Sequence, residues 1–173
     1  MSLSYRVTQF WWNITAEPLP THLRQEIDNY LSSAESELFG RFQESDQWHA
    51  YRVFNTLKEK GHSQSDLLTA ALLHDVGKTK VNVSVWDRTL IVVADFFMPS
   101  KAKSWGQADV RNWKRPFVVR LQHAQWGAEM AQSDGYSTLT IYLIRRHQDP
   151  LPANPQSLAD ELLRFLQWAD DLN

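Results

Sequence analysis

Apolar residues recur at three- and four-residue steps along most of the chain, a spacing typical of amphipathic helices. The pattern predicts helices over residues 5–16, 21–31, 46–60, 65–76, 83–98, 116–132, 137–147 and 157–173, with a short segment at 38–42. Residues 83–98 and 137–147 are rich in β-branched side chains, which also favour strands, but their helical neighbours favour helix. We therefore expect an all-α fold, a compact single-domain helical bundle of about seven or eight helices.

Glycine and proline mark the expected helix ends. Pro18 and Pro20 follow the first predicted helix, and Gly61 and Gly77 end the helices predicted at 46–60 and 65–76. Pro99 ends the helix predicted at 83–98, and Gly135 follows the helix predicted at 116–132. Residues 101–106 are expected to form a loop and residues 149–155 a rigid, proline-rich linker. Because no internal repeat or domain boundary interrupts the pattern, residues 1–173 are expected to form one domain.

The composition agrees with an ordinary globular protein: of 173 residues, 43% are hydrophobic and 22% are charged. The absence of cysteine excludes disulfides and thiolate metal ligands. The longest apolar run, residues 90–94, stops at Asp95, so we expect no membrane span and a cytoplasmic location. A net charge of −2 makes nucleic acid an unlikely partner, although six basic residues against Asp109 alone give residues 101–120 a charge of +5.

His74 and Asp75 lie side by side at the end of an apolar helix. Leu67, Ala70, Ala71 and His74 follow at i, i+3, i+4 and i+7, so the imidazole is expected on the inward face. Burying an imidazole and a carboxylate together costs free energy unless something compensates for it, and a divalent cation does so directly. The alternative is a buried histidine that is hydrogen-bonded to its neighbour and takes part in no chemistry.

Further candidate ligands lie on other predicted helices. Of six histidines, four fall near apolar helix faces: His49, His74, His123 and His147. Each alone could be an ordinary core histidine, but together with Asp75 they indicate a metal site. On the last helix, Asp170 follows Leu163 and Leu166 on the inward face, so Asp170 rather than Asp171 is the expected ligand. His22 and His62 are expected to be exposed.

The ordered set of ligands resembles the HD superfamily of metal-dependent phosphohydrolases. Residues 49–53 resemble its first motif, residues 72–78 its His-Asp signature, and Ala169-Asp170 its last motif. The resemblance covers residues 46–171, an HD-like metal-binding core, and leaves residues 1–45 as an N-terminal helical extension. It implies that His49, His74, Asp75 and Asp170 hold one metal, and that His123 and His147 complete a second site. The Gly-Tyr-Pro tripeptide of the HD-GYP branch is missing after Gly77-Lys78, so cyclic di-GMP is not supported as a substrate.

These ligands suit one or two divalent transition metal ions, with Mn, Fe, Co, Ni and Zn as candidates. Two ions sharing Asp75 would generate a hydroxide nucleophile and stabilise charge at phosphorus. The expected catalytic residues are Asp75, Lys78 and Arg52, and the expected substrate-binding residues are Lys78, Arg52, Arg115 and Arg120. Lys78 and Arg52 could equally be ordinary helix-end or surface charges. Trp105, Trp113 and Trp126 could stack a nucleobase or simply cover the core.

The leading hypothesis is a phosphohydrolase that acts on a small phosphorylated substrate, such as a nucleotide or another small phosphate ester. One alternative is an HD-type di-iron oxygenase, since myo-inositol oxygenase uses a similar ligand order followed by Gly-Lys. Metal identity and oxygen consumption would separate the two. The other alternative is a non-catalytic domain that binds metal or nucleotide, which would show metal-dependent melting without turnover.

Overall fold

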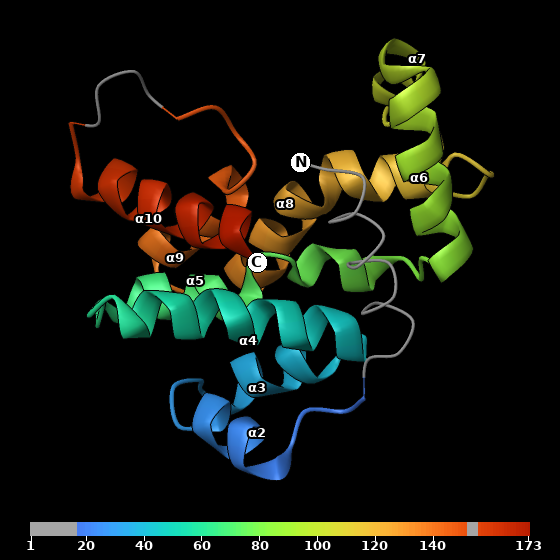
Figure 1. The fold of residues 1–173 in the computed structure, drawn as a ribbon. Helices are drawn as coiled ribbons and strands as arrows, with labels where there is room; N and C mark the ends of the chain where they lie inside the picture. Colours follow the sequence, from blue (N-terminus) through green and yellow to red (C-terminus); the bar gives the residue numbers. More distant parts are fainter. Residues whose placement is uncertain (1–16, 152–155) are drawn as a thin grey trace.

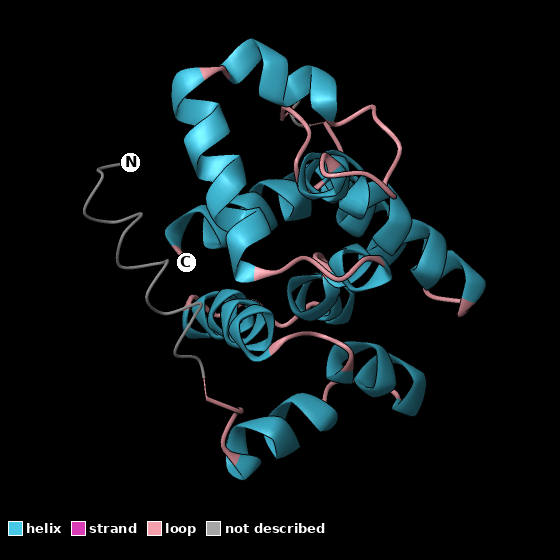
Figure 2. Ribbon diagram, turned by 90° about the vertical axis from the view of Figure 1, so that its right-hand side faces the viewer, coloured by secondary structure: helices cyan, strands magenta, loops and turns pink. Residues whose placement is uncertain are grey.

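The computed structural model describes residues 17–151 and 156–173, so the helix expected at 5–16 lies outside the described residues. Within those ranges the chain forms nine α-helices and one 3₁₀ helix, with no strand (Figures 1 and 2). The all-α prediction is therefore confirmed, including the two β-branched segments that also favoured strand.

Most of the helices follow one another with short connections, and the two longest connections are residues 106–114 and 147–157, of which 152–155 lie outside the described residues. In chain order they are α2 (Thr21–Asp28), α3 (Ser33–Gly40), α4 (Glu44–Glu59), α5 (Ser65–Leu73), η1 (Val76–Lys80), α6 (Val85–Phe97), α7 (Pro99–Trp105), α8 (Arg115–Ser133), α9 (Thr138–Arg146) and α10 (Leu158–Leu172). The short segment expected at 38–42 overlaps the end of α3, which begins five residues earlier and ends at Gly40. Ser32 caps that helix with Glu35 in a reciprocal capping box.

The loop expected at 101–106 is wrong, because residues 99–105 form α7. Pro99 does end α6, but it then occupies the first turn of α7, where its missing N–H removes no helical hydrogen bond. Ala102 packs with Ala94 and Phe117 in a small apolar cluster of its own. The sequence pattern over so few residues is too short to distinguish this helix from a loop.

α5 is the central helix of the main core. Every residue from Leu67 to Leu73 is buried, and α4, α9 and α10 pack around it. In Figure 1, α4 lies along one side of α5, and α9 and α10 lie along the other. Ile27 and Phe39, from the segment before residue 46, belong to the same core cluster. The described part of the N-terminal extension is thus packed into the core that carries α5.

α6 and α7 project from this core, at the upper right of Figure 1. The outward side of α6 carries large apolar side chains that are exposed, including Trp86, Phe96 and Phe97. Its inward side contributes Ala94 to the small cluster with Phe117 of α8. α6 is therefore attached to the bundle through a narrow apolar contact and an ion pair at its first turn.

That ion pair lets the start of α6 respond to pH. Asp87 accepts hydrogen bonds from the Ser84 N–H (2.9 Å) and from Arg115 Nη2 (2.8 Å). Burial raises the pKa of Asp87, but these hydrogen bonds outweigh it and leave the pKa below its usual value. A lowered pKa in the folded state means that Asp87 stabilises the protein at neutral pH and loses this effect as pH falls through that pKa.

We expect Asp87→Ala to cost about 1 kcal/mol of unfolding free energy at pH 7, because the cap and the ion pair are both lost. The difference from wild type should shrink as pH falls below about 4, where the Asp87 carboxyl of the unfolded chain is protonated. Urea denaturation of both proteins at pH 7 and pH 3 measures this difference in unfolding free energy. An equal difference at the two pH values would contradict the role given to the Asp87 charge.

Candidate metal centre

The His-Asp pair lies at a break between two helices. α5 ends at Leu73, His74 is its C-terminal cap, and η1 begins at Val76. The expectation that Gly77 stops the helix is wrong, since the helix ends four residues before it. A Cβ on Gly77 would lie 1.9 Å from the carbonyl oxygen of His123, so this glycine lets η1 pack against the α8 backbone. The close packing places Asp75 beside His123.

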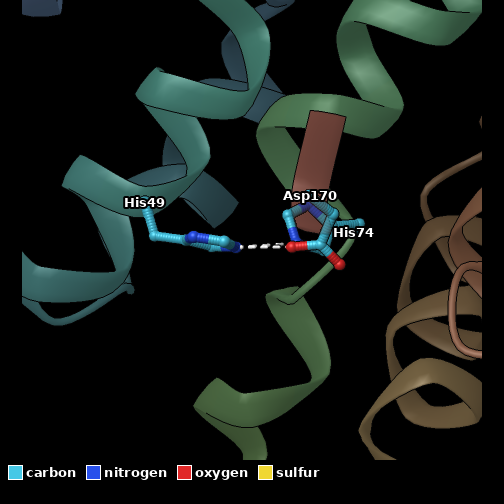
Figure 3. Close-up of side chains that lie close together, drawn as sticks. All are labelled: His49, His74 and Asp170. Atoms are coloured by element: carbon cyan, nitrogen blue, oxygen red, sulfur yellow. Dashed lines mark hydrogen bonds and ion pairs between the residues drawn. The ribbon is translucent and has the colours of Figure 1, made fainter. Parts of the chain in front are cut away.

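One half of the centre joins α4, the end of α5 and α10. His49 Nε2 lies 3.0 Å from Asp170 Oδ1 and 3.3 Å from His74 Nε2 (Figure 3). His74 Nε2 lies 3.7 Å from the same Asp170 oxygen. The three ligand atoms are close enough to bind one ion together.

The other half joins η1, α8 and the end of α9. His123 Nε2 lies 3.1 Å from Asp75 Oδ1, and His147 Nε2 lies 3.7 Å from it. The two imidazole Nε2 atoms are 3.2 Å apart. These ligands are more deeply buried than His49 and Asp170 of the first half, with 1–4% of each side chain exposed.

Asp75 stands between the two halves and turns one oxygen toward each. Its Oδ1 faces His123 and His147, while its Oδ2 lies 3.5 Å from His74 Nε2 and 3.9 Å from His49 Nε2. A carboxylate in this position can bind two ions at once, one through each oxygen. The structure thus brings together the six side chains that the sequence analysis selected as ligands.

Backbone carbonyls fix the orientation of three of the imidazoles. The Nδ1 atoms of His74, His123 and His147 lie 3.0, 3.0 and 2.7 Å from the carbonyl oxygens of Ala71, Val119 and Ile144. A carbonyl only accepts hydrogen bonds, so each neutral ring carries its proton on Nδ1 and a lone pair on Nε2. The Nε2 lone pairs of His123 and His147 then face each other at 3.2 Å with no proton between them.

A bound cation would remove this repulsion, and an Nδ1 atom held by a backbone carbonyl is the arrangement expected of metal-ligating histidines. The donor set therefore fits divalent transition metals bound through imidazole nitrogen and carboxylate oxygen.

Ionisation also suits metal binding. Burial lowers the pKa of His147 to about 3, so the ring is neutral at pH 7. Burial raises the pKa of Asp170, but His74 and a hydrogen bond from His49 outweigh this and bring it to about 2. Burial likewise opposes ionisation of Asp75, yet the Lys78 ammonium and neighbouring His74 hold its pKa well below the usual value. The neutral His147 ring and the ionised carboxylates of Asp75 and Asp170 are thus in the forms that bind metal.

A cavity of about 410 Å³ opens beside the centre. His123 and Lys78 are both part of its lining. The Nζ atom of Lys78 lies 2.5 Å from Asp75 Oδ2. Arg120 lines it as well, whereas Arg115 contacts Asp87 instead and neither Arg115 nor Arg52 is part of the lining. The structure therefore places Lys78 and Arg120 at this cavity and the other two predicted substrate residues outside its lining.

Several polar residues of the cavity were missed by the sequence analysis. They are Arg41, Gln43, Asp46, Thr79, Asn82 and Gln148. Most of them come from turns or helix ends, where no periodic pattern indicates which way a side chain points. Gln148, which directly follows a ligand, is the residue that the sequence could have indicated.

The three tryptophans considered for nucleobase stacking do not line this cavity. Trp105 packs edge-on against Phe117 and Trp113, and Trp126 lies beneath the Lys80 ammonium. Aliphatic side chains such as Val119 and Ile91 form the cavity wall instead.

Comparison with known families identifies the architecture around these ligands. The model of the HD domain family matches residues 48–173, which is well over half of the chain and contains all six ligand positions. No curated protein and no solved structure shows a significant match to the chain. Among the described helices, none is both long enough and apolar enough to cross a membrane.

Proposed function

The chain belongs to the HD domain family, and from this premise we propose that it is a metal-dependent phosphohydrolase acting on a small phosphate ester. The orientation of Asp75 carries the proposal, because its two oxygens face two separate pairs of histidines next to a cavity lined by cations. Bound divalent ions supply Lewis acidity, which polarises phosphoryl oxygens and lowers the pKa of a water molecule toward 7.

The protein supplies the remaining parts of the reaction from its own side chains. Asp75 and the imidazoles would hold the ions, while Lys78 and Arg120 would offer positive charge to the oxygens of the transferring phosphoryl group. Lys78 lies at the boundary between the centre and the cavity, so its ammonium can move from Asp75 to a substrate oxygen. The cavity volume of about 410 Å³ lies in the range of small-molecule sites, and a nucleotide is one candidate substrate.

The proposal is tested by phosphate release from a panel of phosphomonoesters, cyclic nucleotides and dinucleoside polyphosphates. We expect turnover with Mn²⁺ or Co²⁺ and no dependence on oxygen. Failure to hydrolyse any member of the panel would contradict the proposal. Turnover that requires iron and consumes O₂ would instead identify an oxygenase, and metal-dependent melting without turnover would identify a non-catalytic domain.

Lys78→Met is expected to lower kcat/KM about a hundredfold, because a positive charge next to the phosphoryl group is removed. The metal content should stay at the wild-type value, since Lys78 contacts Asp75 but donates no ligand. Lys80→Met is the matched control: this lysine lies two residues further on, over the Trp126 ring and outside the cavity lining. Steady-state kinetics together with metal analysis separate the two variants. Equal activity of Lys78→Met and Lys80→Met would exclude the role given to Lys78.

A further inference from the structure

Among the six ligands, only Asp170 and His49 have side chains that are appreciably exposed to solvent. The Asp170 side chain is 28% exposed and the His49 side chain 21% exposed, whereas the other four are almost completely buried. An ion that arrives from solvent on this side can therefore meet Asp170 before it meets His74 or His123.

A second cavity, of about 340 Å³, lies on this side of the centre. It is lined by His147, Gln148, Asp149, Gln167, Asp170 and Asp171. This lining contains three carboxylates and no lysine or arginine. The lining of the 410 Å³ cavity contains one carboxylate and three cationic residues, which are Arg41, Lys78 and Arg120. Gln148 lines both cavities, so it separates an acidic approach to the centre from a cationic one.

The charge of the acidic cavity comes mainly from one residue outside the ligand set. Asp170 is itself a ligand candidate, and the Asp149 carboxylate is paired with Arg146 at 2.5 Å. Asp171 is exposed, lines the cavity and forms no ion pair with any residue in the described ranges. Its carboxylate is therefore placed to attract a divalent cation without binding it in the centre.

We propose that the 340 Å³ acidic cavity is the route by which divalent cations reach the centre, and that Asp171 accelerates their entry. The anionic substrate approaches through the 410 Å³ cationic cavity, where the same charges that attract a phosphate repel a free cation. Separate routes allow the centre to be loaded whether or not substrate is bound. This inference rests on the metal centre but not on the reaction, so metal uptake tests it without any substrate.

The experiment is stopped-flow mixing of metal-free protein with Co²⁺, followed by its absorption at low ionic strength. We expect Asp171→Asn to slow association about threefold and Asp171→Lys about tenfold, with the differences shrinking at high salt because screening weakens the attraction. The dissociation rate and the number of ions bound at saturation should stay unchanged, because Asp171 donates no ligand.

Glu161→Gln is the matched control, since it removes an exposed carboxylate from the same helix at a position outside the cavity lining. Its association rate should equal that of wild type. An unchanged rate in Asp171→Lys would overturn the proposal, as would faster uptake in Arg120→Gln, which would place the entry route in the cationic cavity. Loss of one bound ion in Asp171→Asn would make Asp171 a ligand and would also overturn it.

Discussion

Replacing Asp75 by asparagine is expected to remove one bound metal ion and to lower kcat by at least about a thousandfold. The reason is the opposed orientation of its two oxygens, one toward His74 and the other toward His123. An asparagine keeps one oxygen but must present its NH₂ group to the other side, where hydrogen atoms exclude a cation. One half of the centre thus loses a ligand and gains a repelling donor.

The effects of Asp75→Asn are measured by metal analysis, activity assays and thermal melting of the same protein samples. Wild type should bind two ions at saturation and show a melting temperature that falls when a chelator is added. Asp75→Asn should bind one ion and lose part of that chelator-dependent shift. Asp171→Asn is the control of identical chemistry, and it should retain both ions and wild-type kcat. Two ions bound by Asp75→Asn would show that Asp75 is not shared between them.

The helical positions of the candidate ligands could be predicted because helical phase is a local property. His49 and His123 each lie on the apolar side of a long helix, and Asp170 follows Leu163 and Leu166 on the face of α10 that packs inward. The same phase places Asp171 outside the cluster, at the acidic cavity. The spacing of apolar residues therefore indicates which side chains meet in the interior, even where the sequence separation exceeds 100 residues.

The features that the sequence does not predict depend on contacts between elements distant in the chain. Arg115 has the charge of a substrate-binding residue, but its guanidinium donates a hydrogen bond to Asp87 on α6, which lies 28 residues earlier in the sequence. Most of the polar residues of the 410 Å³ cavity that the sequence did not indicate come from turns or helix ends, where side-chain direction follows tertiary packing and no periodic pattern exists. The sequence therefore indicated the type of chemistry better than the shape of the space around it.

Gly77 is the clearest example of a residue whose role depends on contacts between elements distant in the chain. Its replacement is expected to have the largest effect on stability. A Cβ at this position would lie 1.9 Å from the His123 carbonyl oxygen and 2.6 Å from the Gly127 nitrogen. Both neighbours are backbone atoms of α8, so η1 must move away as a unit. We expect Gly77→Ala to lower the unfolding free energy by about 3 kcal/mol or more, at the upper end of overpacking effects.

Two other glycines provide a graded control for urea denaturation of metal-free protein. A Cβ on Gly127 would lie 3.1 Å from Ile144 Cγ2 and 3.2 Å from the Gly77 nitrogen, so Gly127→Ala should cost less than Gly77→Ala. A Cβ on Gly40 meets only the end of the Arg24 side chain at 3.8 Å, and Gly40→Ala should be neutral or stabilising by up to about 1 kcal/mol.

The same displacement should weaken metal binding, because Asp75 and His123 are 3.1 Å apart only while η1 lies against α8. Gly77→Ala protein that remains folded should therefore bind Co²⁺ more weakly than Gly40→Ala protein. A stability loss with unchanged metal affinity would show that η1 can move without carrying Asp75 away from α8. Equal stability of the Gly77 and Gly40 variants would contradict the close backbone packing itself.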